Sequence, residues 1–437
     1  MRKNDLGKHI IYQLFLRAFT NEGTLSAAEK LLPHIRETGA DIVYLCPVFV
    51  HDDDENRDGW SARQKQSGLD NPKNPYRMKD YFHVDPEYGT DKDLASFIKT
   101  AHGLNLRVML DLVYFHCGPT AVFLDEHPDF IVRNPDGTPA LGQWCFPKLD
   151  YTNPALREYL WENMEYFVRE FGCDGYRCDV GDAVPLDFWR EGVRRIRNIK
   201  PDIIMLNEGQ NREWTEEVFD CNYDFGLSGA LRNVLLGNAP VSKLVSYRET
   251  YEREHLAPGA LSILCFDNHD IASDAYEQRD GVLLGNAAVD DMVFVCMTLR
   301  GIPFLYNGNE ISDTHRHSIW GSRTTRGNLT IDWQNALTTE GQARMALVQK
   351  LAGLRRSHSA LWEGDCRFCD TASEQVLVYR RMAGDETVVC AVNLSCADAE
   401  FTVPELPPRA ELLLGSVQYT DKGSVVLPPH GFAMWKE

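Results

Sequence analysis

Three carboxylates stand out because each follows a short apolar run in the middle of the chain. Asp179 lies in GYRCDV, Glu208 ends IIMLNE, and Asp270 ends FDNHD. If these runs are strands of successive βα units, their carboxyl ends meet at one edge, where barrel enzymes carry their chemistry. Two carboxyl groups in different environments can act as nucleophile and proton donor in cleaving a sugar acetal. The spacing therefore predicts glycosidic chemistry at these three acids.

Arg177 stands two residues before Asp179 in the same run. Side chains two apart on a strand share a face, so a fixed cation there would lower the pKa of the aspartate and hold its orientation. Glu208 would need a raised pKa to carry a proton, which its apolar approach permits. A retaining mechanism would place the two carboxyl groups about 5–5.5 Å apart. The simpler interpretations are an ordinary ion pair and a polar strand end.

The elements that must position these side chains are strands alternating with amphipathic helical patterns. Apolar strands are predicted at residues 10–16, 42–48, 106–113, 175–180, 203–207, 262–266 and 302–306, with a weaker candidate at 222–225. Helical patterns lie between them at residues 25–38, 92–103, 154–171 and 187–199. The helix that starts at Pro154 has Asn153 as its expected cap. Eight such repeats predict an α/β fold, a parallel (β/α)8 TIM barrel.

The sequence also divides into regions with different patterns of strands, helices and loops. The connections over residues 49–90 and 116–150 are long, and long loops on this side of a barrel build the substrate site. Short strands follow the barrel at residues 376–380, 387–392, 400–403, 410–414 and 424–427. We therefore predict a catalytic barrel over residues 1–358, with a short inserted subdomain after the third strand at about 117–150. A C-terminal antiparallel, β-sandwich-like domain is predicted over 359–437.

Composition narrows the class of protein. The 437 residues are 43% hydrophobic and carry a net charge of −19, which argues against a nucleic-acid partner. No apolar stretch is long enough to span a bilayer, and no apolar signal segment precedes Ile10. The twelve cysteines are scattered, which is typical of free thiols in a reducing cytoplasm. Cys366 and Cys369 form a lone C-x-x-C without the second pair of a metal site. We expect a cytoplasmic protein with no membrane partner, and its oligomeric state stays open.

These runs, with four other segments, resemble the motifs of the α-amylase superfamily of glycoside hydrolases and transglycosidases. IYQLFLRAF (11–19) is similar to that family's first strand, and DYFHVDPEYGT (80–90) to its segment entering the second helix. DLVYFH (111–116) resembles the motif ending the third strand, and GIPFLYNGNE (301–310) the last strand. The three acid-bearing runs resemble the nucleophile, acid/base and stabiliser motifs. The motifs occur in order, nearly end to end.

The resemblance implies roles for the acids. Asp179 would form a covalent glycosyl-enzyme, Glu208 would act as general acid and then base, and Asp270 would grip sugar hydroxyls and stabilise the oxocarbenium-like transition state. His116 and His269 would donate hydrogen bonds to the same sugar, whose apolar face an aromatic ring can cover.

The substrate-binding residues that the resemblance implies are therefore Tyr76, His116, Arg177 and His269, with Tyr76 as the stacking ring. Two departures concern metal. Phe115 stands where many α-amylases have the asparagine that helps hold calcium, and Gly181-Asp-Ala replaces their Lys-His after the nucleophile. We therefore expect no cofactor and no metal at the usual calcium site. The acidic run HDDDEN at residues 51–56 is interpreted as a solvated charge run.

Three functions remain open. The leading one is a retaining hydrolase of α-glucans that prefers short maltooligosaccharides. The second is a transglycosylase of α-glucans or disaccharides, which uses the same acids. The third is a non-catalytic sugar-binding or transporter-partner relative, a class that typically loses the acids or carries an anchor. Bond preference and endo or exo action stay open, and the loop over residues 315–333 is expected to shape the pocket.

Overall fold

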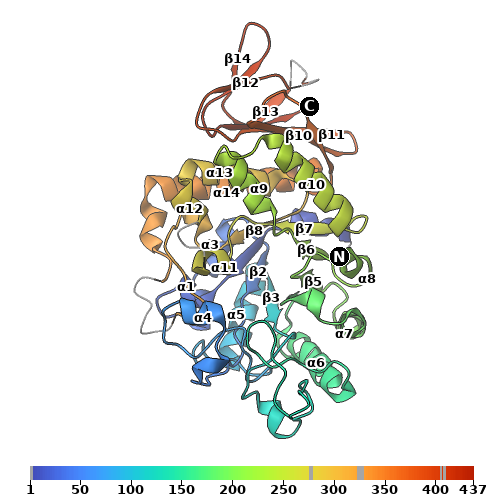
Figure 1. Cartoon of the computed structure of the whole chain (residues 1–437). Helices are drawn as coiled ribbons and strands as arrows, with labels where there is room; N and C mark the ends of the chain where they lie inside the picture. Colours follow the sequence, from blue (N-terminus) through green and yellow to red (C-terminus); the bar gives the residue numbers. More distant parts are fainter. Residues whose placement is uncertain (1–2, 275–278, 322–328, 404–405, 407–409) are drawn as a thin grey trace.

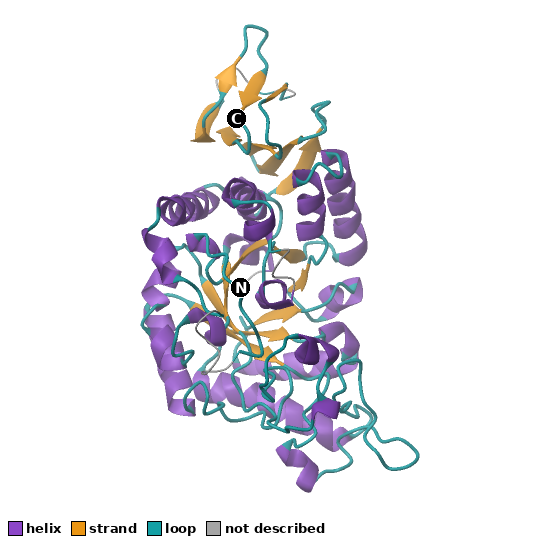
Figure 2. Cartoon of the chain, turned by 60° about the vertical axis from the view of Figure 1, so that its left-hand side comes forward, coloured by secondary structure: helices purple, strands orange, loops and turns teal. Residues whose placement is uncertain are grey.

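The predicted barrel is confirmed by the structure, a computed structural model that describes residues 3–274, 279–321, 329–403, 406 and 410–437 (Figure 1). Eight parallel strands close in chain order, with helices packed around them (Figure 2). They are β1 (Ile11–Leu14), β2 (Ile42–Leu45), β3 (Arg107–Leu112), β4 (Gly175–Cys178), β5 (Ile204–Asn207), β6 (Cys221–Tyr223), β7 (Leu261–Leu264) and β8 (Ile302–Tyr306). The weak candidate at residues 222–225 is confirmed as a strand, but the strand begins one residue earlier and ends at Tyr223.

The barrel strands are apolar throughout because they are covered on both faces. Every residue in them is buried except Arg107, which is half-buried. Strands of this kind read as continuous hydrophobic runs rather than alternating ones. Gly175 shows how close the strands lie, because a Cβ there would stand 2.6 Å from the Ile204 carbonyl oxygen.

Two of the surrounding helices begin at side-chain caps, one of which the sequence indicates. The Asn153 side chain accepts from the Ala155 N–H at the start of α6, and Thr90 forms a capping box at the start of α5. The pattern at residues 25–38 is two helices rather than one, because Pro33 opens the second. The helices up to α8 are α1 (Leu16–Phe19), α2 (Leu25–Glu29), α3 (Leu32–Glu37), α4 (Ala62–Gln66), α5 (Asp91–Gly103), α6 (Pro154–Tyr166), α7 (Leu186–Ile199) and α8 (Arg212–Glu217).

The later helices follow the last three barrel strands along the chain. They are α9 (Leu227–Leu235), α10 (Val241–His255), α11 (His269–Asp274), α12 (Asp280–Leu283), α13 (Asn286–Thr298), α14 (Thr339–Ser357) and α15 (Ser359–Trp362). The helix α13 contacts α14, α9 and strand β11 of the C-terminal region. It therefore links the barrel to the C-terminal sheets.

The C-terminal strands form two antiparallel sheets with order β13-β16-β11-β10-β9 and β12-β15-β14. Side chains of both sheets, among them Trp435 and Phe401, share one buried cluster. The domain limits at residues 358 and 359 stay a prediction. The strands are β9 (Asp365–Cys369), β10 (Val376–Ala383), β11 (Glu386–Asn393), β12 (Ala399–Phe401), β13 (Glu411–Gly415), β14 (Gln418–Tyr419), β15 (Val425–Leu427) and β16 (Phe432–Lys436).

The acidic run at residues 51–56 is not simply solvated, so that interpretation was wrong for Asp52. This side chain is fully buried, 3.0 Å from the Arg77 guanidinium, and it accepts from both the N–H and the hydroxyl of Thr120 at 2.7 Å. Asp53 pairs with Lys79 at 2.7 Å. The run therefore fastens the two long connections to each other.

Candidate active site

A cavity of about 410 Å³ opens at the carboxyl ends of the barrel strands. Its walls come from the strand ends, from both long connections and from the loop after β8, as expected for the substrate site of this fold. Seven of its lining residues are those predicted from the sequence: Tyr76, His116, Arg177, Asp179, Glu208, His269 and Asp270. Part of the loop at residues 315–333 also lines it, through Ile319 and Trp320; residues 322–328 of that loop lie outside the described residues.

Arg177 on β4 binds three carboxylates at once. Its guanidinium lies 2.9 Å from an Asp111 oxygen, 2.8 Å from Asp179 Oδ1 and 2.6 Å from Glu208 Oε1. Asp111 comes from the neighbouring strand β3, and Glu208 follows β5 on the other side. Arg177 is buried, so these contacts are shielded from water. Sequence reasoning found the pair with Asp179 but did not assign a site role to Asp111.

The electrostatics of this cluster differ from the expectation in one respect. Arg177 does act to lower the pKa of Asp179, but burial acts more strongly, so the pKa of this carboxyl lies well above its ordinary value. Burial also raises the pKa of Glu208, against the opposing effects of Arg177 and of the Val180 N–H. Three carboxylates around one cation carry a net charge of −2, which favours keeping a proton on the cluster.

Val180 holds Glu208 through a strained backbone. Its φ is +45°, in the left-handed region that a β-branched residue rarely adopts. This conformation directs the Val180 N–H to Glu208 Oε2 at 2.8 Å. Strain of this kind persists where the surroundings impose it, and it is concentrated at functional sites. The residue after the candidate nucleophile thus fixes the candidate proton donor.

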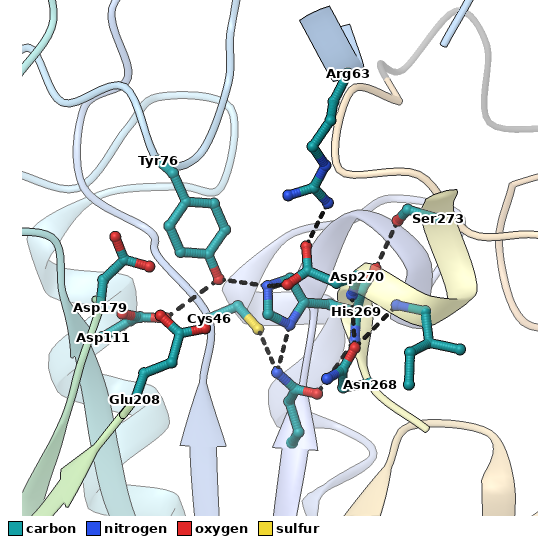
Figure 3. Close-up of polar contacts among 12 residues, drawn as sticks. Cys46, Arg63, Tyr76, Asp111, Asp179, Glu208, Asn268, His269, Asp270 and Ser273 are labelled. Carbon is teal, nitrogen blue, oxygen red and sulfur yellow. Dashed lines mark hydrogen bonds and ion pairs between the residues drawn. The ribbon is translucent and has the colours of Figure 1, made fainter. Parts of the chain in front are cut away.

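Asp270 lies opposite this cluster and is held by Arg63 (Figure 3). Arg63 Nη2 donates to Asp270 Oδ1 at 2.6 Å. Burial would raise the pKa of Asp270, but His269 and Arg63 outweigh it and lower the pKa to about 2. Arg63 lies on α4, in the long connection after β2, and its guanidinium also covers the Trp320 ring at 5.6 Å. No motif pointed to Arg63, since Asp270 is 207 residues away.

His269 and Tyr76 form a stacked pair between the two groups of acids. Their rings are 5.4 Å apart at 22°, and the Tyr76 hydroxyl lies 2.7 Å from His269 Nε2 (Figure 3). The backbone N–H of His269 donates to Gln13 Oε1, which fixes the orientation of the Gln13 amide. Gln13 Nε2 then lies 2.7 Å from the ring nitrogen Nδ1 of His269 and can donate to it. The ring therefore accepts at Nδ1 and carries its proton at Nε2. Burial lowers the pKa of His269 and keeps the ring neutral.

His116 follows β3 and lies against the insertion. Its Nε2 is 2.7 Å from the Tyr76 carbonyl oxygen, so Nε2 carries the proton and donates. Burial lowers the pKa of His116 to about 4. The rings of Trp144 and Phe146, both from the insertion, pack on the imidazole at 5.4 and 4.8 Å. The neutral ring can then accept a sugar hydroxyl at Nδ1, whereas a donated bond was expected.

Histidine, cysteine and acidic side chains are the candidate ligands of a metal ion. Within the part of the chain that the structure describes, no three histidine, cysteine or acidic side chains come together in a way that could hold a metal ion. Phe115, which stands where an asparagine ligand was considered, packs its ring 5.9 Å from that of Trp144. Nor is any helix in the described ranges long and apolar enough to cross a membrane.

Comparison with known proteins assigns the class. A family model of the alpha amylase catalytic domain matches residues 9–133 and 141–365, and one of the maltogenic amylase C-terminal domain matches residues 366–434. The chain belongs to the alpha-amylase family, and the protein is a glycoside hydrolase. In fold it is similar to an alpha-amylase from Lactobacillus plantarum, with TM-score 0.82 and 24% identity over 99% of this chain and all of that one.

Two curated proteins are similar to this chain in sequence over most of its length. One is a cyclomaltodextrinase of Geobacillus thermopakistaniensis, 25% identical over 94% of this chain and 70% of the relative. The other is a maltogenic alpha-amylase of Bacillus acidopullulyticus, 25% identical over 91% of this chain and 68% of the relative.

Proposed function

We propose that this protein is a retaining hydrolase of α-glucans that acts on short maltooligosaccharides through a covalent glycosyl-Asp179 intermediate. The observation that carries the proposal is that Arg177 forms ion pairs with both Asp179 and Glu208, while Asp270 lines the same cavity. The names of the cyclomaltodextrinase and maltogenic amylase relatives support the substrate class.

In the first step, Glu208 would give its proton to the glycosidic oxygen while Asp179 attacks the anomeric carbon. The bond between the anomeric carbon and the leaving sugar breaks, and an ester to Asp179 forms. Glu208, now ionised, would take a proton from water in the second step, and that water would displace Asp179 with a second inversion. The raised pKa of Glu208 suits a group that must begin protonated.

Asp270 and Arg63 would hold the sugar during both steps. With a pKa of about 2, Asp270 is ionised at every working pH and can accept sugar hydroxyls. Its charge also stabilises the positive charge that develops on the ring in the transition state. Tyr76 would cover the apolar face of that sugar, since its ring lines the cavity beside His269.

Transglycosylation remains the second candidate, and one observation favours it. Phe225 lines the cavity, is 48% exposed, and stacks on Tyr223 at 5.1 Å, on the strand next to β5. An exposed ring there offers a platform for an acceptor sugar. A relative named alpha-1,4-glucan:maltose-1-phosphate maltosyltransferase, from Salinibacter ruber, is 27% identical over 88% of this chain and 59% of its own length.

Time-resolved product analysis on maltoheptaose, sucrose, trehalose and isomaltose tests the proposal, with Asp179→Asn as the control. We expect α-anomeric short maltooligosaccharides from the wild type and none from the variant. Products longer than the starting sugar would shift the assignment to transglycosylation. Tight sugar binding without turnover of any substrate would favour the non-catalytic interpretation.

We also infer a cytoplasmic location. All twelve cysteines are free, and most are buried. Unpaired thiols in this number suit a reducing compartment, where disulfides rarely persist. Cell fractionation with an antibody to the chain would test this location, and recovery outside the cytoplasm would contradict it.

The net charge of −19 argues against a nucleic-acid partner.

A further inference from the structure

An exposed thiol, an imidazole and a buried carboxylate line up outside the cavity, where the C-terminal sheet meets the barrel. Cys396 follows β11, His430 precedes β16, and Asp291 belongs to α13. Cys396 Sγ lies 3.4 Å from His430 Nε2, and His430 Nδ1 lies 2.7 Å from Asp291 Oδ2. A thiol, an imidazole that can carry charge beside it, and a carboxylate that holds the imidazole are the parts of an activated nucleophile.

The backbone around this triad is held by hydrogen bonds other than the contact between the Cys396 sulfur and the His430 imidazole. Asn393 is fully buried, and its Nδ2 donates to the Ala397 carbonyl at 2.7 Å and to the Pro428 carbonyl at 2.8 Å. The His430 N–H donates to the Ser395 carbonyl at 3.0 Å. These bonds fix the two turns to each other and so bring Cys396 and His430 side by side.

His430 is held in an unusual conformation. Its φ is +52°, in the left-handed region, which costs energy for any residue with a Cβ. The hydrogen bond with Asp291 raises the pKa of His430 to about 9, so the ring is an imidazolium near neutral pH. An imidazolium next to a sulfur stabilises the thiolate, which is the form of a thiol that attacks a disulfide.

The burial pattern argues against a purely stabilising role. Asp291 is fully buried, yet its Oδ1 has no hydrogen-bond partner among the residues described. A buried oxygen left unpaired costs stability, so an arrangement built for stability alone would satisfy it. The thiol at the other end of the triad is exposed, whereas eight of the twelve cysteines are buried.

We propose that Cys396, activated by His430 and oriented through Asp291, is a modification site that exchanges with the disulfides of low-molecular-weight thiols such as glutathione disulfide. Cys396 gives its thiol proton to water, and the thiolate beside the His430 imidazolium attacks one sulfur of the disulfide. The old S–S bond breaks as the new one forms, and the departing thiolate takes a proton from water. One disulfide is consumed and one mixed disulfide is made, so no other oxidant or reductant is needed.

The test is exchange of the reduced, full-length protein with glutathione disulfide near neutral pH, followed by peptide mass spectrometry. Cys396 is expected to react first, but its exposure alone would give that order. The decisive comparison is therefore His430→Asn, because asparagine accepts the left-handed backbone and lacks the imidazole. We expect the rate at Cys396 to fall on the order of tenfold in this variant, with a smaller fall in Asp291→Asn.

Half-buried Cys145 in the insertion serves as the internal reference, and its rate should not change in either variant. Circular dichroism and turnover of maltooligosaccharides verify that the variants fold. An unchanged rate at Cys396 in His430→Asn would overturn the proposal. If that variant does not fold, the wild-type rate at Cys396 is compared with that of free N-acetylcysteine. A rate no higher than that of the free thiol would equally overturn it.

Discussion

At the scale of single residues, the site is organised around one buried guanidinium shared by Asp111, Asp179 and Glu208. Each carboxylate lies within 2.9 Å of Arg177, so none is neutralised by a cation of its own. Repulsion among them makes the gain of one proton easier than it would be for an isolated acid. Glu208 is the most exposed of the three and faces the cavity. It is therefore the group best placed to deliver that proton to a substrate.

Removal of the Glu208 carboxyl should affect substrates according to their leaving group. Fluoride leaves without protonation, whereas a sugar does not. We expect Glu208→Ala to lower kcat on maltotriose by roughly 10³-fold but to keep turnover of α-maltosyl fluoride within about tenfold of the wild type, since general acid catalysis contributes about 10²–10⁴-fold. Steady-state kinetics on both substrates decide the matter. Equal losses on the two would contradict the role of proton donor.

The pair of Arg63 and Asp270 should control the acid side of the pH profile. Arg63 helps to hold the pKa of Asp270 at about 2, so in the wild type Asp270 loses its charge only below the range in which the enzyme works. Without Arg63 the pKa rises and Asp270 becomes protonated at a higher pH. In Arg63→Ala we expect kcat/KM to fall about tenfold at its optimum, with the acid limb moved upward.

Arg63→Lys is the matched control, because it keeps a cation within reach and should restore part of both effects. Both side chains are more than a third exposed, at 37% and 38%, so the effect belongs to the site rather than to the stability of the fold. A pH profile of Arg63→Ala that overlays the wild type would show that the ion pair has no part in catalysis.

At the scale of elements, the insertion after β3 supplies an aromatic wall. Trp144 and Phe146 pack on His116, and both line the cavity. We expect Trp144→Ala to raise KM for maltotriose about fivefold, since aromatic contacts of this kind contribute roughly 1 kcal/mol. Leu141→Ala in the same insertion is the control, because Leu141 is 52% exposed and outside the cavity. Equal KM values for both variants would exclude Trp144 from the binding site.

The barrel strands could be predicted because burial on both faces makes them apolar throughout. The strands β9 and β14 could not, because β9 alternates exposed and half-buried residues and β14 has two exposed residues. The short apolar strand β16 was missed. The acids of the site follow predictable strands. Arg63 does not, because a side chain from the short helix α4 reaches Asp270 only once the whole barrel has closed. Asp111 was visible within a motif, but its bond to Arg177 depends on the pairing of β3 with β4.

At the scale of the whole molecule, two buried arginines join the barrel to the C-terminal sheet at the end of α13. Arg355 donates to the carbonyls of Met297 and Gly301, and Arg381 on β10 donates to those of Thr298 and Gly364. Burial lowers the pKa of both guanidinium groups. Cations at the carboxyl end of a helix also interact favourably with its dipole. This contact ties the last turn of α13 to both parts of the chain.

Loss of this contact should destabilise the protein without changing its chemistry. Arg381→Met leaves two buried carbonyls without their donors, which costs on the order of 1–3 kcal/mol each. We expect a clearly lower thermal midpoint and an unchanged KM for maltotriose below it. Arg367→Met on the facing strand β9 is the control, because Arg367 is exposed. A thermal midpoint of Arg381→Met equal to that of the control would contradict this role of the arginine.

The central claim is that Asp179 carries the sugar between the two steps of the reaction. The most direct measurement uses a 5-fluoro-α-glucosyl fluoride, whose fluoride leaves readily while the ring fluorine slows hydrolysis of the intermediate. Peptide mass spectrometry then locates the sugar. We predict a glycosyl adduct on the peptide that contains Asp179, and none in Asp179→Asn. An adduct on another residue, or inactivation without any adduct, would contradict the claim.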